Sequence, residues 1–255
     1  MTGFQERKHF MKNYKITIQY DGSRYSGWQK QGNTKNTIQG KIEDVLSKMT
    51  QEEIEIHGSG RTDAGVHALA QVANFKTTKV YATNEIFTCL NTYLPQDIRV
   101  LTVEECAPRF HARLNAVRKH YRYIVNCNVI CDVFSRKYVT HLPGTYDIYA
   151  MKEAADALIG THDFKSFCEN KRMKKSTVRT IDSIEITEEN GILSFDFYGD
   201  GFLYHMVRIL TGTLLEVGSH KRSADSIAEI IERKERPCAG FTAPPQGLFL
   251  VEVDY

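Results

Sequence analysis

The chain has 255 residues, with 33 Lys and Arg against 31 Asp and Glu, which gives a formal net charge of +2. Its 42% hydrophobic and 25% charged residues are typical of a globular protein, and 17 glycines and six prolines are too few for a collagenous or low-complexity chain. A net charge this close to zero excludes a histone-like polycation but allows local basic patches.

The cysteines and the first residues of the chain indicate a reducing compartment. The six cysteines include no Cys-x-x-Cys pair and no four metal ligands at zinc spacing, so we interpret them as free thiols. Residues 1–13 are polar, lack the apolar core of a signal peptide and are expected to form a flexible leader. No run approaches the roughly 20 apolar residues that cross a bilayer. We therefore expect a cytoplasmic protein without a membrane partner.

The first half of the chain mixes strand and helix patterns. A period of two predicts a strand over 14–20, and a period of 3.6 predicts a helix over 38–49 with Asn36 or Thr37 as its N-cap. The other elements expected here are strands at 54–56, 69–75 and 98–103 and a helix at 85–92. This half therefore has the order β-α-β-β-α-β.

The second half repeats that order. The elements expected here are a strand over 117–125, a helix over 148–159, strands over 178–186 and 192–198, helices over 204–217 and 223–234, and a strand over 248–253. Asn190-Gly191 predicts a tight hairpin turn. We expect an α+β fold of two ferredoxin-like or RRM-like halves, 14–107 and 108–255, with mainly antiparallel sheets and a boundary near Ala107-Pro108.

Two basic clusters lie within the nearly neutral chain. Residues 113–122 contain three arginines and one lysine without an acid, and residues 165–179 contain six basic residues and a single acid, Glu169. Each cluster also contains or adjoins aromatic residues: Tyr121 in the first, Phe164 and Phe167 in the second. Basic side chains neutralise phosphates while aromatic rings stack on unpaired bases, so the two clusters together favour an RNA partner over a solvated loop.

The glycine-rich segment HGSGRTDAGVH, residues 57–67, is the place where a functional loop is expected between two strands. Arg61 and Asp63 are two residues apart and would project from the same side of an extended backbone, where they could form an ion pair. Four interpretations of this segment remain open. They are a dinucleotide fingerprint without its third glycine, a metal site of His57, Asp63 and His67, a structural Asx-turn at Asp63, and a catalytic carboxylate at Asp63.

The sequence GRTDAGVHA at 60–68 resembles the signature of the bacterial tRNA pseudouridine synthase A family. Further blocks resemble the same family in the same order: YDGSRYSGWQKQ at 20–31, TIQGKIE at 37–43, LPQDI at 94–98, FHAR at 110–113, KHYRY at 119–123, FLYHMVRILTG at 202–212 and APPQGLFLVEVDY at 243–255. Together they cover almost all of residues 14–255.

The resemblance implies an enzyme that isomerises uridine to pseudouridine in the anticodon stem-loop of tRNA, just 3′ of the anticodon. It also implies the two-half pseudouridine-synthase fold, a homodimer that binds RNA in basic clefts, and no cofactor or metal. By resemblance, Asp63 is the catalytic aspartate and Arg61 pairs with it and fills the space of the flipped nucleotide. Tyr121 stacks on the uracil and accepts the C5 proton, and Arg208 pairs with Asp63 or a phosphate.

Three further expectations concern the RNA contacts, the departures from the family pattern and the alternative functions. The expected phosphate contacts are Arg24, Lys30, Arg113, Arg118 and Lys119. The sequence departs from the family at Asp200, where many relatives have asparagine, in the basic run Lys171–Lys175 and in the longer leader. The alternatives are a synthase acting on ribosomal RNA, a noncatalytic RNA-binding protein and a metal-dependent hydrolase.

Overall fold

Ten strands form one continuous sheet in the computed structural model, which describes residues 11–170 and 175–255. They are β1 (Lys12–Tyr20), β2 (Ile56–Gly58), β3 (His67–Thr77), β4 (Ile98–Cys106), β5 (Arg118–Asn126), β6 (Thr140–His141), β7 (Gly160–Asp163), β8 (Val178–Glu189), β9 (Ile192–Gly199) and β10 (Leu248–Asp254). The main order is β4-β1-β3-β10-β5-β9-β8-β7, with β2 paired to β3 and β6 to β5. Only β10–β3 and β5–β6 pair in parallel among the described strands, which confirms a mainly antiparallel α+β fold.

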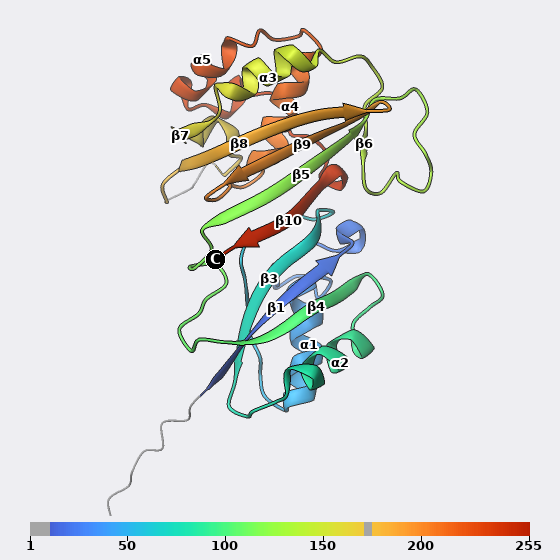
Figure 1. Ribbon diagram of the computed structural model, residues 1–255, viewed down its shortest axis with the longest axis vertical. Helices are drawn as coiled ribbons and strands as arrows, with labels where there is room; N and C mark the ends of the chain where they lie inside the picture. Colours follow the sequence, from blue (N-terminus) through green and yellow to red (C-terminus); the bar gives the residue numbers. More distant parts are fainter. Residues whose placement is uncertain (1–10, 171–174) are drawn as a thin grey trace, which may run out of the picture.

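Helices pack beside both ends of this sheet. They are α1 (Ile38–Thr50), α2 (Thr83–Tyr93), α3 (Ile148–Asp156), α4 (Met206–Gly218) and α5 (Ser226–Arg233). Figure 1 shows α1 and α2 beside β4, β1 and β3, and α3, α4 and α5 beside β5, β9 and β8. Helix α1 begins as predicted, because the Thr37 hydroxyl accepts from the Gly40 amide at 3.2 Å and Ile38, Ile42 and Leu46 are fully buried.

The predicted elements are present, but several of their boundaries differ. The Asn190-Gly191 hairpin is confirmed, and φ is +53° and +75° at these two residues, as a type I′ turn requires. Strand β7 was not predicted, because its sequence GTHD has no apolar alternation. Strand β1 begins at Lys12, within the expected leader, and residues 1–10 of that leader lie outside the described residues.

Strand β10 connects the two expected halves. It pairs in parallel with β3, with Leu250 opposite Ala68, and antiparallel with β5, with Leu250 also opposite Tyr121. Figure 1 shows β3, β10 and β5 side by side in the middle of the sheet. The backbone hydrogen bonding is therefore continuous between the first and second halves, and the division near Ala107-Pro108 stays a prediction. This junction brings the loop that precedes β3 next to Tyr121 on β5.

Candidate active site

The loop between β2 and β3 carries Asp63 and is fixed at several points. The Trp28 amide donates to the Thr62 carbonyl at 3.0 Å, and the Tyr20 and Thr62 hydroxyls hydrogen-bond at 2.7 Å in the core. A turn follows, in which the Val66 amide donates to the Asp63 carbonyl at 3.1 Å and Gly65 has φ +79°. A positive φ favours glycine at this position. Asp63 is therefore presented at the first position of a well-anchored turn.

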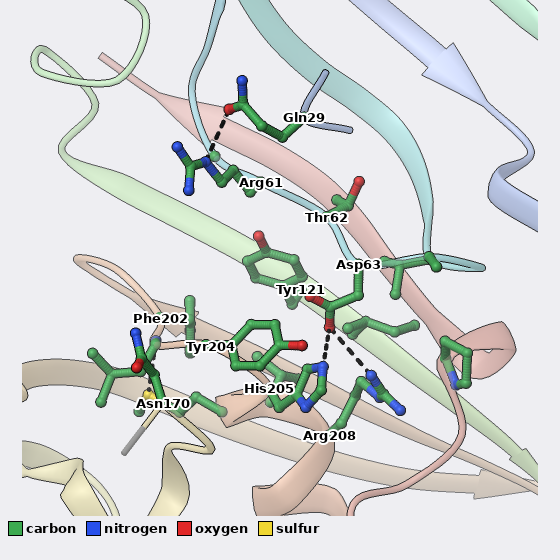
Figure 2. Close-up of a pocket in the computed structure, with 18 of the residues that line it drawn as sticks. Gln29, Arg61, Thr62, Asp63, Tyr121, Asn170, Phe202, Tyr204, His205 and Arg208 are labelled. Carbon is green, nitrogen blue, oxygen red and sulfur yellow. Dashed lines mark hydrogen bonds and ion pairs between the residues drawn. The ribbon is translucent and has the colours of Figure 1, made fainter. Parts of the chain in front are cut away.

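The Asp63 carboxylate has two cationic or potentially cationic neighbours. Its Oδ2 lies 3.2 Å from Nη1 of Arg208 and 3.3 Å from Nε2 of His205, both near the start of α4. Figure 2 shows these two side chains converging on the same oxygen. The Asp63 side chain is 21% exposed and that of Arg208 is 12% exposed. The expected contact between Arg208 and Asp63 is thus present. Among the described residues the Asp63 carboxylate contacts these two side chains and accepts from no loop amide, so it forms no Asx-turn.

The predicted ion pair between Arg61 and Asp63 is wrong. Nε of Arg61 donates to Oε1 of Gln29 at 2.9 Å, and Figure 2 shows the guanidinium turned toward Gln29 and away from Asp63. Each of the two side chains has another partner, since Gln29 accepts from Arg61 while Arg208 and His205 contact Asp63. Arg61 still lines the same cavity.

Tyr121 lies on β5 beside Asp63, as Figure 2 shows. The ring is buried, and it packs edge-on against Phe202 with 5.2 Å between the ring centroids. No hydrogen bond to its hydroxyl is found among the described residues. Burial, and then the proximity of Tyr20 and Asp63, raises the pKa of the Tyr121 phenol. The hydroxyl is therefore protonated at neutral pH.

These side chains line a cavity of about 760 Å³. This volume lies within the range of small-molecule sites. Several basic residues line the cavity: Arg61, Arg113, Lys119, Lys175, Arg179 and Arg208. Lys119 donates to the Ser59 carbonyl at 2.8 Å. Burial, together with the charges of Arg113 and Arg179, lowers the pKa of Lys119 to about 8.

The five expected phosphate contacts separate into two groups. Arg113 and Lys119 line the cavity, whereas Arg24, Lys30 and Arg118 form ion pairs on the surface. Their acidic partners are Asp97, Glu43 and Asp182, respectively. A contact between RNA and any of these three basic residues would have to compete with its acidic partner.

The alternative sites at residues 57–67 have no support in the geometry. Both ring nitrogens of His67 have partners, the Gly22 amide at 3.1 Å and the Lys137 carbonyl at 3.0 Å. No group of three metal-ligating side chains occurs within residues 11–170 and 175–255. A dinucleotide fingerprint must also open a helix, whereas the glycine-rich segment leads into strand β3.

Sequence reasoning missed several residues that line the cavity. They are Gln29, Arg179, Phe202, Tyr204 and His205. His205 stands in the HMVR block beside Arg208, and Arg179 ends the second basic cluster, so both carried a signal. Asp200, the departure from the family pattern, accepts from the Thr180 amide at 3.0 Å. Of the Lys171–Lys175 run, residues 171–174 lie outside the described residues.

Comparison with known proteins shows the family to which this chain belongs. The family model described as tRNA pseudouridine synthase matches residues 16–115 and 154–255. The chain belongs to that family. The expected resemblance and the expected class of enzyme, an isomerase, are thereby confirmed.

Individual relatives match nearly the whole chain. A tRNA pseudouridine synthase A 2 of Bacillus cereus is 47% identical over 96% of this chain and 100% of its own length. The tRNA pseudouridine synthase A 1 of Clostridium tetani is 48% identical over the same shares of the two chains. The crystal structure of a Cbf5-Nop10-Gar1 complex has a TM-score of 0.38 at 13% identity, covering 93% of this chain and 48% of the other, which is too weak a similarity to be informative.

Proposed function

We propose that this protein isomerises uridine to pseudouridine in tRNA, with Asp63 as its catalytic carboxylate. The observation that carries the proposal is the position of Asp63 in a basic cavity, where Arg208 and His205 hold one carboxylate oxygen and Tyr121 lies alongside. The relatives named tRNA pseudouridine synthase A support the same substrate class.

The reaction breaks the glycosidic bond from C1′ to N1 and forms a bond from C1′ to C5. The detached uracil rotates before the new bond forms, C5 loses its proton, and N1 gains one. A carboxylate serves this sequence by attacking a carbon of the sugar or base and leaving again, by removing a sugar proton, or by stabilising positive charge at the sugar. All these routes need the Asp63 carboxylate placed against the flipped nucleotide, and the contact with the Arg208 guanidinium orients it for that task.

Tyr121 and Arg61 have different roles in this proposal. The buried Tyr121 ring provides a face for the uracil, and its protonated hydroxyl is free to donate to the substrate. This favours stacking and hydrogen-bond donation over the role of proton acceptor, because a phenol with a raised pKa stays protonated at neutral pH. Arg61, tethered to Gln29 at the cavity wall, fills space that the nucleotide vacates when it leaves its stack.

The proposed substrate is the anticodon stem-loop, with target uridines just 3′ of the anticodon. A uridine must leave its stack to reach Asp63, at a cost of a few kcal/mol that is smallest in loops and at stem ends. Arg113, Lys175 and Arg179 are positioned along the cavity to contact the phosphates next to the flipped nucleotide. We propose no cofactor or metal for this chemistry.

We also propose that the protein acts as a homodimer in the cytoplasm. The segment 127–139 between β5 and β6 exposes apolar side chains that a second copy would cover. They are Val129, Ile130, Val133 and Phe134, which are between 60% and 87% exposed. None of the helices in the described part of the chain is long and apolar enough to cross a bilayer.

The experiment that tests the function is a turnover assay on unmodified tRNA transcripts. Wild-type and Asp63→Asn protein are incubated with the transcripts, and pseudouridine is mapped at single-nucleotide resolution. We expect new pseudouridine in the anticodon arm with the wild type alone. Modification of ribosomal RNA fragments only would move the substrate to ribosomal RNA. RNA binding without any modification would leave a noncatalytic RNA-binding protein.

A further inference from the structure

His205 lies between two carboxylates. Its Nε2 is 3.3 Å from Oδ2 of Asp63, and its Nδ1 hydrogen-bonds Oε2 of Glu169, which follows the 3-10 helix at Phe164–Phe167. The His205 side chain is 13% exposed. The second basic cluster, which contains Glu169 as its single acid, is thereby connected to the catalytic loop through one imidazole ring.

The two contacts of His205 join the two carboxylates through one ring. The Nδ1 contact with Glu169 is a hydrogen bond, and Nε2 lies against the Asp63 oxygen on the other side of the ring. A carboxylate oxygen accepts and an imidazole N–H donates, so each nitrogen of the ring faces an acceptor. A change at Glu169 is therefore transmitted to Asp63 through the orientation of His205.

Glu169 is held as the anionic partner. Burial favours its neutral form, but hydrogen bonds from Thr242 and His205 and the charge of Arg236 outweigh this and lower the pKa of Glu169. The Thr242 hydroxyl donates to Oε1 at 2.8 Å, and Nη2 of Arg236 lies 3.9 Å from the same atom. The described charged groups around His205 are thus the acids Asp63 and Glu169 and, behind them, the bases Arg208 and Arg236.

The backbone and a neighbouring ring also fix His205. Its φ is +62°, a left-handed backbone conformation that residues other than glycine rarely adopt. Helix α4 begins at the next residue. The ring stacks on Tyr204 with 3.8 Å between the ring centroids. An unfavourable backbone conformation retained at a reactive site points to a function for the side chain.

The contacts of Arg208 and His205 fall on one oxygen of Asp63. Arg208 and His205 approach Oδ2, and no hydrogen bond or ion pair to Oδ1 is formed by the residues that the structure describes. Figure 2 shows the two dashed contacts meeting at a single oxygen. The carboxylate is held at one oxygen, and the other is left for the substrate.

We propose that Glu169 and His205 are a positioning pair, which anchors Oδ2 of Asp63 so that Oδ1 faces the cavity and reacts. This inference rests on the proposed function, since it assigns a task to the same carboxylate. Glu169 holds the His205 ring, and the ring shares with Arg208 the orientation of Asp63. Neither Glu169 nor His205 transfers a proton to the substrate in this scheme.

The test compares His205→Gln and Glu169→Gln with two control variants. His220→Gln removes another histidine with a positive φ that faces a carboxylate, Asp147, at 3.6 Å on the surface. Glu229→Gln removes a carboxylate from an exposed ion pair with Arg233. Rates are measured at saturating and at limiting tRNA, which separates kcat from KM, and tRNA affinity is measured by binding. Thermal unfolding verifies that each variant is folded.

We expect both test variants to lower kcat about 10- to 100-fold, as a misplacement of a reactive group by about 1 Å does, with KM changed less than about threefold. The controls keep wild-type kcat. A general loss of structure would instead lower tRNA affinity and thermal stability together with kcat. If His205→Gln does not fold, Glu169→Gln alone decides, since it keeps the histidine.

Two results would overturn the inference. One is wild-type kcat in Glu169→Gln, and the other is a loss confined to KM or tRNA affinity. Asp63→Asn separates these results from a failure of the proposed function. If the wild type modifies tRNA, Asp63→Asn is inactive and Glu169→Gln is unaffected, the positioning pair is refuted while the function stands. If the wild type modifies no tRNA, the function itself fails.

Discussion

Replacing Arg208 with alanine removes the guanidinium that contacts Asp63, leaves His205 as the remaining described contact of that carboxylate, and removes the side-chain donor to the Ala243 carbonyl. Nη1 of Arg208 lies 3.2 Å from Oδ2 of Asp63, and its Nε donates to the Ala243 carbonyl at 2.6 Å. At 3.2 Å and an effective dielectric constant of about 20, the attraction is about 5 kcal/mol, and desolvation of the two groups offsets much of it. A hydrogen bond to a charged group contributes about 1.5–3 kcal/mol net.

The expected result is a fall in kcat of about 10- to 150-fold, since every 1.36 kcal/mol is tenfold in rate. The assay is a single-turnover reaction on an unmodified tRNA transcript at saturating enzyme, with tRNA affinity measured separately. Arg208→Lys is the matched control, because it keeps the charge but not the planar fork that serves Asp63 and Ala243 together, and it should lie between wild type and Arg208→Ala. Wild-type kcat in folded Arg208→Ala would refute this reasoning. A loss only in affinity would instead assign Arg208 to a phosphate.

Three further predictions follow from the cavity. Because the pKa of Lys119 is about 8 and phosphate prefers the charged amine, tRNA affinity should fall as pH rises through 8 in filter binding, and Lys119→Arg should remove that dependence. Tyr121→Phe removes a hydroxyl without a described protein partner, so we expect an unchanged Tm but a kcat lowered at least tenfold; equal kcat would remove the hydroxyl from the reaction. Gly65→Ala places a Cβ 3.1 Å from Pro245 at φ +79° and should cost about 1–2 kcal/mol of unfolding free energy in urea titrations, whereas unchanged stability would contradict the turn geometry.

The sequence allowed most of the elements to be predicted, because their apolar periodicity follows the burial of the sheet and helices. Ile16 and Ile18 of β1 and Ile38 and Ile42 of α1 are fully buried, as their spacing indicated. The continuity of the sheet could not be predicted, because periodicity shows which face of a strand is buried but not which strand lies beside it. The position of β10 between β3 and β5 depends on pairing between distant residues.

The sequence predicted the main residues of the candidate site, but not all of the side chains that contact Asp63. Asp63 and Tyr121 were identified by their motifs, and the structure places both at one cavity. An ion pair of Asp63 with Arg61 was expected from their separation of two residues, but Arg61 donates to Gln29 instead. The contacts found, Arg208 and His205, are more than 140 residues away in sequence and reach Asp63 through the start of α4.

The place of β10 has a consequence for folding during synthesis. Strands β3 and β5 border the cavity, yet both pair with β10, which follows every other described strand in the chain. A ribosome makes these segments in order, so Asp63 and Tyr121 emerge long before the strand that brings their neighbourhoods together. Until then β3 and β5 each present an unpaired edge, and pairing across such sequence separation is slow. Nascent chains should therefore gain RNA-modifying competence in one late step, and this interval is when they most need protection from association through open strand edges.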